Sequence, residues 1–169
     1  MSGRKHAQAT ARMSLLLAIA LILGYVEHLL PAATSVPGVK LGLANVVLLY
    51  AVYLMDARRA FALMLAKAAL SGLLFAGASA MMYALAGGVI SLAAMLAVRR
   101  VRGVSVVGVS AVGAAFHNIG QIGLAVLVVK TPALLGYLPV LLVSGAITGI
   151  ATGVIAKLVM RHVGDGGWD

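Results

Sequence analysis

The chain has 169 residues, of which 63% are hydrophobic and only 10% are charged, and its mean hydropathy is +1.10. A soluble domain is about half apolar and about a quarter charged, so this composition excludes an ordinary soluble domain and predicts an all-α integral membrane protein. The formal net charge of +9 does not indicate nucleic acid binding, because the basic residues lie between apolar runs, as the positive-inside rule requires.

Six apolar spans are predicted after a basic segment at 1–13, separated by polar turns or by loops that contain Gly and Pro. The spans cover 14–30, 39–55, 60–76, 80–98, 104–129 and 133–159. A cleaved signal peptide is disfavoured, because the first run ends in Tyr25-Val26-Glu27-His28 without a clean small-x-small cleavage site. The predicted organisation is a cytoplasmic N-terminal segment at 1–13, a six-helix transmembrane domain at 14–159 and a cytoplasmic tail at 160–169.

The basic residues are distributed unevenly between the two sides that six spans define. Ten of the 13 Lys and Arg residues fall on the side of both termini: Arg4, Lys5, Arg12, Arg58, Arg59, Arg99, Arg100, Arg102, Lys157 and Arg161. Lys40 and Lys130 fall on the other side, and Lys67 lies within the third span. Since Lys and Arg concentrate in cytoplasmic loops, both termini are predicted to be cytoplasmic.

Small and hydroxyl residues recur at helical spacing in two of the spans. In the last span the two series are Gly145, Gly149, Gly153 and Ser144, Thr148, Thr152. Such stripes let helices approach closely, so we predict internal packing for the glycines, while the hydroxyls can pack or line a cavity. In the first span Ser14, Ala18, Ala20 and Gly24 have similar spacings, which suit either internal packing or a partner helix.

The fifth span contains a polar cluster, His117-Asn118-Ile119-Gly120-Gln121. On a helix, His117 and Gln121 lie one turn apart, and Asn118 lies three residues from Gln121. Three polar side chains near the middle of a membrane are costly unless they face one another, water or a ligand. We favour a surface that faces a substrate, and an interhelical hydrogen-bond cluster is the alternative.

The second span opens with Pro37-Gly38, which presets a bend, followed by Lys40 and, deeper, Asn45. A helix N-terminus with an ammonium group nearby attracts anions. The alternative for Lys40 is an interfacial lysine that reaches toward the headgroups. Asn45 needs a polar partner at its depth.

The sequence also suggests roles for the other charged residues within or beside the spans. Glu27 and His28, at the outer end of the first span, can pair with Lys40 or reach a ligand. The Lys67 side chain can extend to the cytoplasmic surface. Asp56 and Arg59, three residues apart, are predicted to form an ion pair at a helix end.

Several catalytic signatures are absent from the sequence. The segment from Gly103 to Ser110 has the outline of a phosphate-binding loop, but Val109 stands where Lys is required. There is no cysteine, no HExxH helix and no cluster of carboxylates. We therefore predict no enzymatic activity, no cofactor and no ATPase motor within the chain.

Three segments resemble the Gx transporter family, whose members are often labelled heptaprenyl diphosphate synthase component I. They are Val36-Pro37-Gly38-Val39-Lys40-Leu41-Gly42-Leu43-Ala44-Asn45, Tyr83-Ala84-Leu85-Ala86-Gly87-Gly88, and His117-Asn118-Ile119-Gly120-Gln121. The resemblance covers about Leu15 to Leu158. Within the second segment, Gly87-Gly88 can bend the fourth span or admit a neighbouring helix.

The resemblance implies a substrate-binding S component of an energy-coupling-factor transporter, a multi-pass protein of the bacterial cell membrane. It implies a six-helix bundle with a pocket in its outer half for a small, anionic or amphipathic metabolite, and a separate transmembrane scaffold with ATPase subunits as partners. The candidate ligand residues are Lys40, Asn45, Tyr83, His117, Asn118 and Gln121. The candidate scaffold contacts are Ser14, Ala18, Ala20 and Gly24.

The prenyl synthase label conflicts with the residues, because prenyl transfer needs aspartate-rich magnesium motifs and the chain has only Glu27, Asp56, Asp165 and Asp169 as acids. An accessory membrane subunit for heptaprenyl diphosphate or quinone synthesis is the alternative function. A membrane anchor for a redox complex is a further alternative, and it would need no pocket.

Overall fold

The structure is a computed structural model, and it describes residues 2–30 and 41–164. All regular elements in this part of the chain are helical. The α-helices are α1 (Ser2–Leu29), α2 (Leu43–Leu54), α3 (Ala57–Ser71), α4 (Ala78–Val98), α5 (Val106–Val129) and α6 (Leu138–Gly164). A π-helical turn, η1 (Gly72–Ala76), continues α3, and a 3₁₀ segment, η2 (Pro132–Tyr137), precedes α6.

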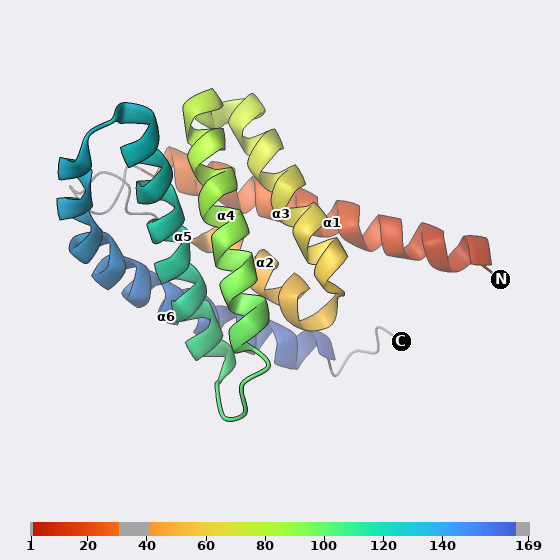
Figure 1. Cartoon of the computed structure of the whole chain (residues 1–169). Helices are drawn as coiled ribbons and strands as arrows, with labels where there is room; N and C mark the ends of the chain where they lie inside the picture. The colour runs from red at the N-terminus through yellow and green to blue at the C-terminus, as the bar shows by residue number, and fades with distance from the viewer. Residues whose placement is uncertain (1, 31–40, 165–169) are drawn as a thin grey trace.

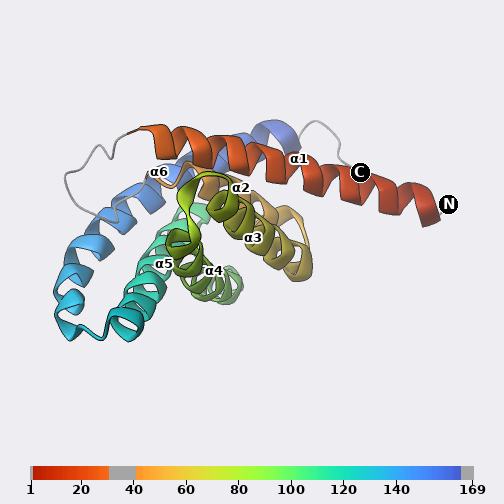
Figure 2. The same ribbon diagram turned by 90° about the horizontal axis from the view of Figure 1, so that it is seen from above.

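The helices form one bundle in which α3, α4 and α5 lie side by side, while α1 and α6 cross them obliquely (Figure 1). Seen from above, α1 runs along one side of the bundle and α4 lies on the other (Figure 2). The most extensive packing joins α5 to α4 and to α6. The short helix α2 contacts α1, α3 and α6 and is buried along most of its length.

Five helical segments are long and apolar enough to cross a membrane, which confirms the predicted membrane class. They are Ala7–Leu29, Ala57–Ala76, Ala78–Val98, Val106–Val129 and Pro132–Val163. The second predicted span differs, because α2 has only 12 residues. Its length of about 18 Å is well short of the hydrocarbon core of about 30 Å.

The start of α2 at Leu43 has a local cause. Gly42 precedes the helix in a left-handed conformation, with φ of 76°, which glycine adopts without steric cost. Of the predicted span at 39–55, residues 39 and 40 lie outside the described part of the chain. The central helix of the bundle is therefore shorter than its apolar sequence predicted.

The first and last helices extend beyond the predicted spans. α1 begins at Ser2 and includes most of the segment at 1–13, while α6 continues to Gly164, into the predicted tail. The first segment is rich in Ala, Arg, Lys and Gln, which favour helix. At the end of α6, Arg161 and His162 lie in the last turn, where basic groups stabilise the helix dipole.

The turns follow the predicted polar and glycine positions. Asp56 caps α3 by accepting a hydrogen bond from the Arg59 backbone amide at 2.9 Å, and its carboxylate pairs with the Arg59 guanidinium at 3.2 Å, as predicted. Gly77, with φ of 89°, allows the reversal between η1 and α4. The Arg99 side chain donates to the carbonyl of Val52 and so ties the α4–α5 turn to the end of α2.

Glycines set the spacing of α4, α5 and α6. A Cβ atom at Gly149 would lie 2.8 Å from Ala111 Cα, and one at Gly153 would lie 2.8 Å from Val107 Cα, both on α5. A Cβ at Gly87 would lie 2.7 Å from the His117 carbonyl oxygen. The predicted glycine stripe of α6 therefore packs internally, and Gly87 admits α5.

We expect the two ends of the bundle to lie on opposite sides of the membrane. The α2–α3 and α4–α5 turns, with their arginines, lie toward one end of the bundle, and the α5–η2 turn with Lys130 lies toward the other (Figure 1). Because the natural chain has no cysteine, single cysteines report cleanly. An impermeant maleimide applied to intact cells should label Thr131→Cys and not Ala57→Cys. The reverse pattern would contradict the predicted orientation.

Candidate functional site

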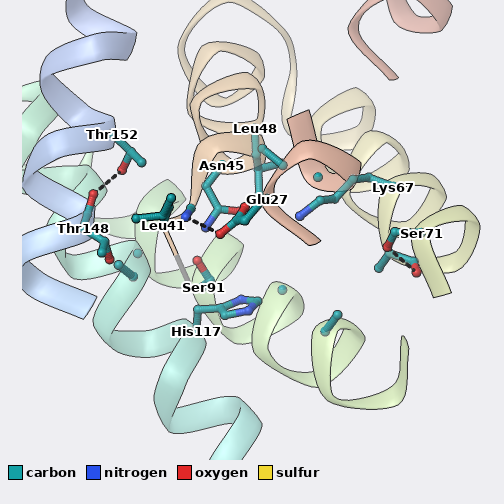
Figure 3. A pocket seen from close by; sticks show the side chains of 18 of the residues that line it. Glu27, Leu41, Asn45, Leu48, Lys67, Ser71, Ser91, His117, Thr148 and Thr152 are labelled. Carbon is teal, nitrogen blue, oxygen red and sulfur yellow. Dashed lines mark hydrogen bonds between the residues drawn. The ribbon is translucent and has the colours of Figure 1, made fainter. Parts of the chain in front are cut away.

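A cavity of about 490 Å³ lies inside the bundle and is lined by residues from all six α-helices. Its volume falls within the roughly 300–1,000 Å³ that is typical of small-molecule sites. Figure 3 shows side chains from α1, α2, α3, α4, α5 and α6 around the same space. The bundle therefore encloses room for a small ligand.

The lining combines apolar and polar side chains. Leu48, Leu49, Met64 and Met95 supply apolar wall. The polar side chains that line the cavity are Glu27, His28, Asn45, Lys67, Ser71, Ser91, Ser110, His117, Asn118, Gln121, Thr148 and Thr152. A mainly apolar wall with a limited set of polar groups is typical of metabolite sites.

Four of the six predicted ligand residues line the cavity together. Asn45 comes from α2, whereas His117, Asn118 and Gln121 come from α5. Tyr83 is half-buried on α4 and is not part of the lining. Lys40 lies outside the described residues.

Asn118 has a partner on another helix. Its side-chain nitrogen donates to the Leu141 carbonyl oxygen at 2.5 Å, which joins α5 to α6. A Cβ atom at Gly145 would lie 2.5 Å from that nitrogen, so the amide occupies the space that this glycine leaves. Asn118 therefore has an interhelical structural contact, although it also lines the cavity.

Three other polar residues of the cavity lining have no hydrogen bond of this kind: Asn45, Ser91 and Gln121. None of their side chains makes a hydrogen bond within residues 2–30 and 41–164, and all three line the cavity. Ser91 is only 6% exposed. No fully buried side-chain N or O atom lacks a partner in the described residues. The unbonded polar atoms of these three residues are therefore accessible, and water or a ligand in the cavity can bond to them.

Glu27 was not a predicted ligand residue, yet it lines the cavity from the last turn of α1. Its Oε1 atom accepts a hydrogen bond from the Gly42 backbone amide at 2.6 Å. This contact links the end of α1 to the start of α2. The sequence indicated that Glu27 could reach a ligand or pair with Lys40, but not that it bonds to the backbone of Gly42.

Lys67 also lines the cavity, half-buried on α3 (Figure 3). The sequence left the role of Lys67 open, because a lysine within a span can extend toward the cytoplasmic surface. The signal that could have identified it is its position, since an ionisable residue within a membrane span is by default a functional candidate.

Hydroxyl groups of α5 and α6 form one wall of the cavity. Ser110 Oγ and Thr152 Oγ1 lie 3.1 Å apart, and Thr152 also donates to the Thr148 carbonyl oxygen at 2.9 Å. Thr148 donates to the carbonyl oxygen of Gly145. The hydroxyl groups of α6 thus form hydrogen bonds within the bundle, and Thr148 and Thr152 also line the cavity. Both predicted roles, packing and cavity lining, therefore apply to them.

An aromatic contact joins α1 to η1 beside the cavity. The Phe75 ring lies 5.5 Å from Tyr25 in an edge-on arrangement and 5.5 Å from the His28 imidazole. Phe75 and His28 line the cavity. The π-helical turn that carries Phe75 therefore forms part of the wall, as π turns often do at functional sites.

The predicted scaffold-contact residues of α1 do not share one environment. Ser14 and Ala18 are exposed, whereas Ala20 is 2% exposed and belongs to the core. A Cβ at Gly24 would lie 3.8 Å from Ala44 Cβ and from Phe75. Of these four residues, only Ser14 and Ala18 are therefore exposed on the surface of α1.

Residues 2–30 and 41–164 contain no group of three or more His, Cys, Asp or Glu side chains that could hold a metal ion. In a comparison with protein families, the family model described as heptaprenyl diphosphate synthase component I matches residues 16–159. No curated protein and no solved structure matches the chain.

Proposed function

The chain belongs to the heptaprenyl diphosphate synthase component I family, and from that premise we propose that it binds a small metabolite as the membrane subunit of a transporter. In this proposal the chain resembles an S component of an energy-coupling-factor transporter and performs no catalysis. The observation that carries the proposal is the cavity of about 490 Å³ inside the bundle, with polar side chains from all six α-helices.

Polar side chains without a hydrogen-bond partner support the proposal that the cavity binds a ligand. Asn45, Ser91 and Gln121 line the cavity and lack hydrogen-bond partners in the described residues. Their polar atoms are accessible and not fully buried, so a ligand in the cavity can form hydrogen bonds with them. A membrane anchor without a ligand has no need for polar groups from several helices around one cavity, so their convergence favours a binding site.

Energy would come from other proteins in this proposal. The sequence has no complete phosphate-binding loop, so ATPase subunits and a transmembrane scaffold are the proposed partners. Ser14 and Ala18, on the exposed face of α1, are the proposed contacts with the scaffold, since small residues allow close helix approach.

We place the protein in a bacterial cell membrane, with the chain crossing six times and both termini in the cytoplasm. The arginines at the α2–α3 and α4–α5 turns support this orientation. Lys40 remains a proposed ligand residue on the opposite side, beyond the described residues.

Purified protein in liposomes should retain a small molecule but should not accumulate it against a gradient when ATP is supplied. Mass spectrometry of compounds that co-purify with the detergent-solubilised protein would identify the molecule, and radiolabelled uptake would follow accumulation. Accumulation driven by ATP with this chain alone would contradict the proposal, as would purified protein without any bound metabolite.

The family description favours one second candidate, an accessory subunit that binds heptaprenyl diphosphate for a separate synthase. The same mass spectrometry separates the two functions, because a co-purified prenyl diphosphate would support the accessory subunit. A non-prenyl metabolite would support transport.

A further inference from the structure

The cavity wall carries a carboxylate as well as an ammonium group. Glu27 on α1 and Lys67 on α3 are both half-buried, and both line the cavity. Figure 3 shows Lys67 extending from α3 toward Glu27. Charged groups of opposite sign therefore line the same cavity. The expectation of an anionic ligand, which rested on Lys40, did not include the carboxylate.

The Glu27 carboxylate is held in place by the backbone. Its Oε1 atom accepts the Gly42 amide proton at 2.6 Å, and Gly42 adopts a left-handed conformation that suits glycine. The Oε2 atom makes no hydrogen bond and no ion pair within the described part of the chain. One oxygen is therefore bonded to the backbone, while the Glu27 side chain lines the cavity.

We propose that Glu27 and Lys67 select a dipolar metabolite, one that carries a cationic or N–H donor group and an anionic or acceptor group. This inference rests on the proposed binding function and specifies its substrate class. The donor group of the ligand meets Glu27, and its acceptor group meets Lys67. A ligand charge placed among apolar helices is costly unless an opposite charge or a hydrogen bond compensates it, and the cavity wall offers one side chain of each sign to a ligand that carries both.

The same arrangement disfavours a diphosphate. A diphosphate would bring several negative charges close to the Glu27 carboxylate, and like charges repel strongly where the dielectric constant is low. The remaining wall, with Leu48, Leu49 and Phe75 beside the amides of Asn45 and Gln121, suits a compact apolar or heterocyclic body with a few hydrogen-bonding groups.

The test uses a substitution that separates the structural role of Glu27 from its charge. In Glu27→Gln the side-chain oxygen can still accept the Gly42 amide proton, so the melting temperature should stay unchanged while the negative charge is lost. In Lys67→Met the positive charge is lost with similar side-chain length. Asp56→Asn is the matched control, because Asp56 is an exposed carboxylate outside the cavity lining.

The probe is a defined equimolar mixture of zwitterionic, monoanionic and monocationic metabolites of similar size. Detergent-solubilised protein is incubated with the mixture and desalted, and the retained compounds are quantified by mass spectrometry. Wild-type protein and Asp56→Asn should retain zwitterions preferentially. Glu27→Gln should raise the ratio of retained monoanions to zwitterions by about tenfold. Lys67→Met should raise the ratio of retained monocations to zwitterions by a similar factor.

The outcomes distinguish this inference from the proposed function. If Glu27→Gln keeps the wild-type selectivity, or if wild-type protein prefers monoanions, the inference is wrong and the binding function stands. If wild-type protein retains none of the three classes, the binding function itself is contradicted and the inference falls with it. If Glu27→Gln does not fold, the wild-type protein still tests the inference, because the inference requires it to retain zwitterions in preference to monoanions and monocations.

Discussion

Replacing Gly120 with alanine is expected to lower the melting temperature of the protein markedly. Gly120 is buried where α5 meets α4, and an added Cβ atom would lie 2.8 Å from Gly87 Cα and 2.9 Å from the Ala86 carbonyl oxygen. Both are backbone atoms, which cannot move aside as the end of a flexible side chain can. Overpacking of this kind costs about 1–3 kcal/mol, and the two helices would have to separate.

The same helix offers a matched control. Gly123 lies three residues further along α5, and an added Cβ there would have no atom within 4 Å. Thermal melting in detergent should therefore show a loss of stability for Gly120→Ala and little change for Gly123→Ala. Equal melting temperatures for the two variants would show that α4 and α5 do not pack as described.

Replacing Gln121 with methionine is expected to weaken metabolite binding about tenfold or more, with little change in stability. Methionine keeps the length of the side chain and its packing against α4 but removes the amide, which has no hydrogen-bond partner in the described residues. The loss of one ligand hydrogen bond corresponds to about 1.4 kcal/mol or more. The affinity is measured with the metabolite that co-purifies with wild-type protein.

Asn118→Ala should have the opposite effect. The Asn118 amide donates to the Leu141 carbonyl oxygen of α6, so its loss should destabilise the bundle by about 1 kcal/mol and reduce affinity less than Gln121→Met does. If Gln121→Met lowers the melting temperature and leaves affinity unchanged, Gln121 belongs to the scaffold and not to the site.

The sequence determined the features that depend on local patterns. Apolar runs long enough to cross a bilayer predicted α1, α3, α4, α5 and α6, because hydropathy summed along one segment decides membrane insertion. The four-residue glycine spacing of α6 predicted its close packing, since helical geometry places such residues on one face. The Asp56–Arg59 pair followed from the same geometry.

The tertiary structure decided which partner each side chain meets. Asn118 and Gln121 are close in sequence and were predicted as one cluster, yet only Asn118 bonds to α6. Ala18 and Ala20, two residues apart, point to nearly opposite sides of α1, and only the tertiary structure shows that the side of Ala20 is the buried one. These differences depend on where neighbouring helices cross, and the spacing within one helix carries no such information.

The cavity itself belongs to this second category. The sequence left the role of Lys67 open and did not assign Glu27 to a hydrogen bond with Gly42, whereas the structure places both at the cavity wall. A local sequence pattern can predict the face of a helix on which a residue lies and the cost of burying a charge. It cannot predict which helices line a common cavity, because that depends on packing across the whole bundle.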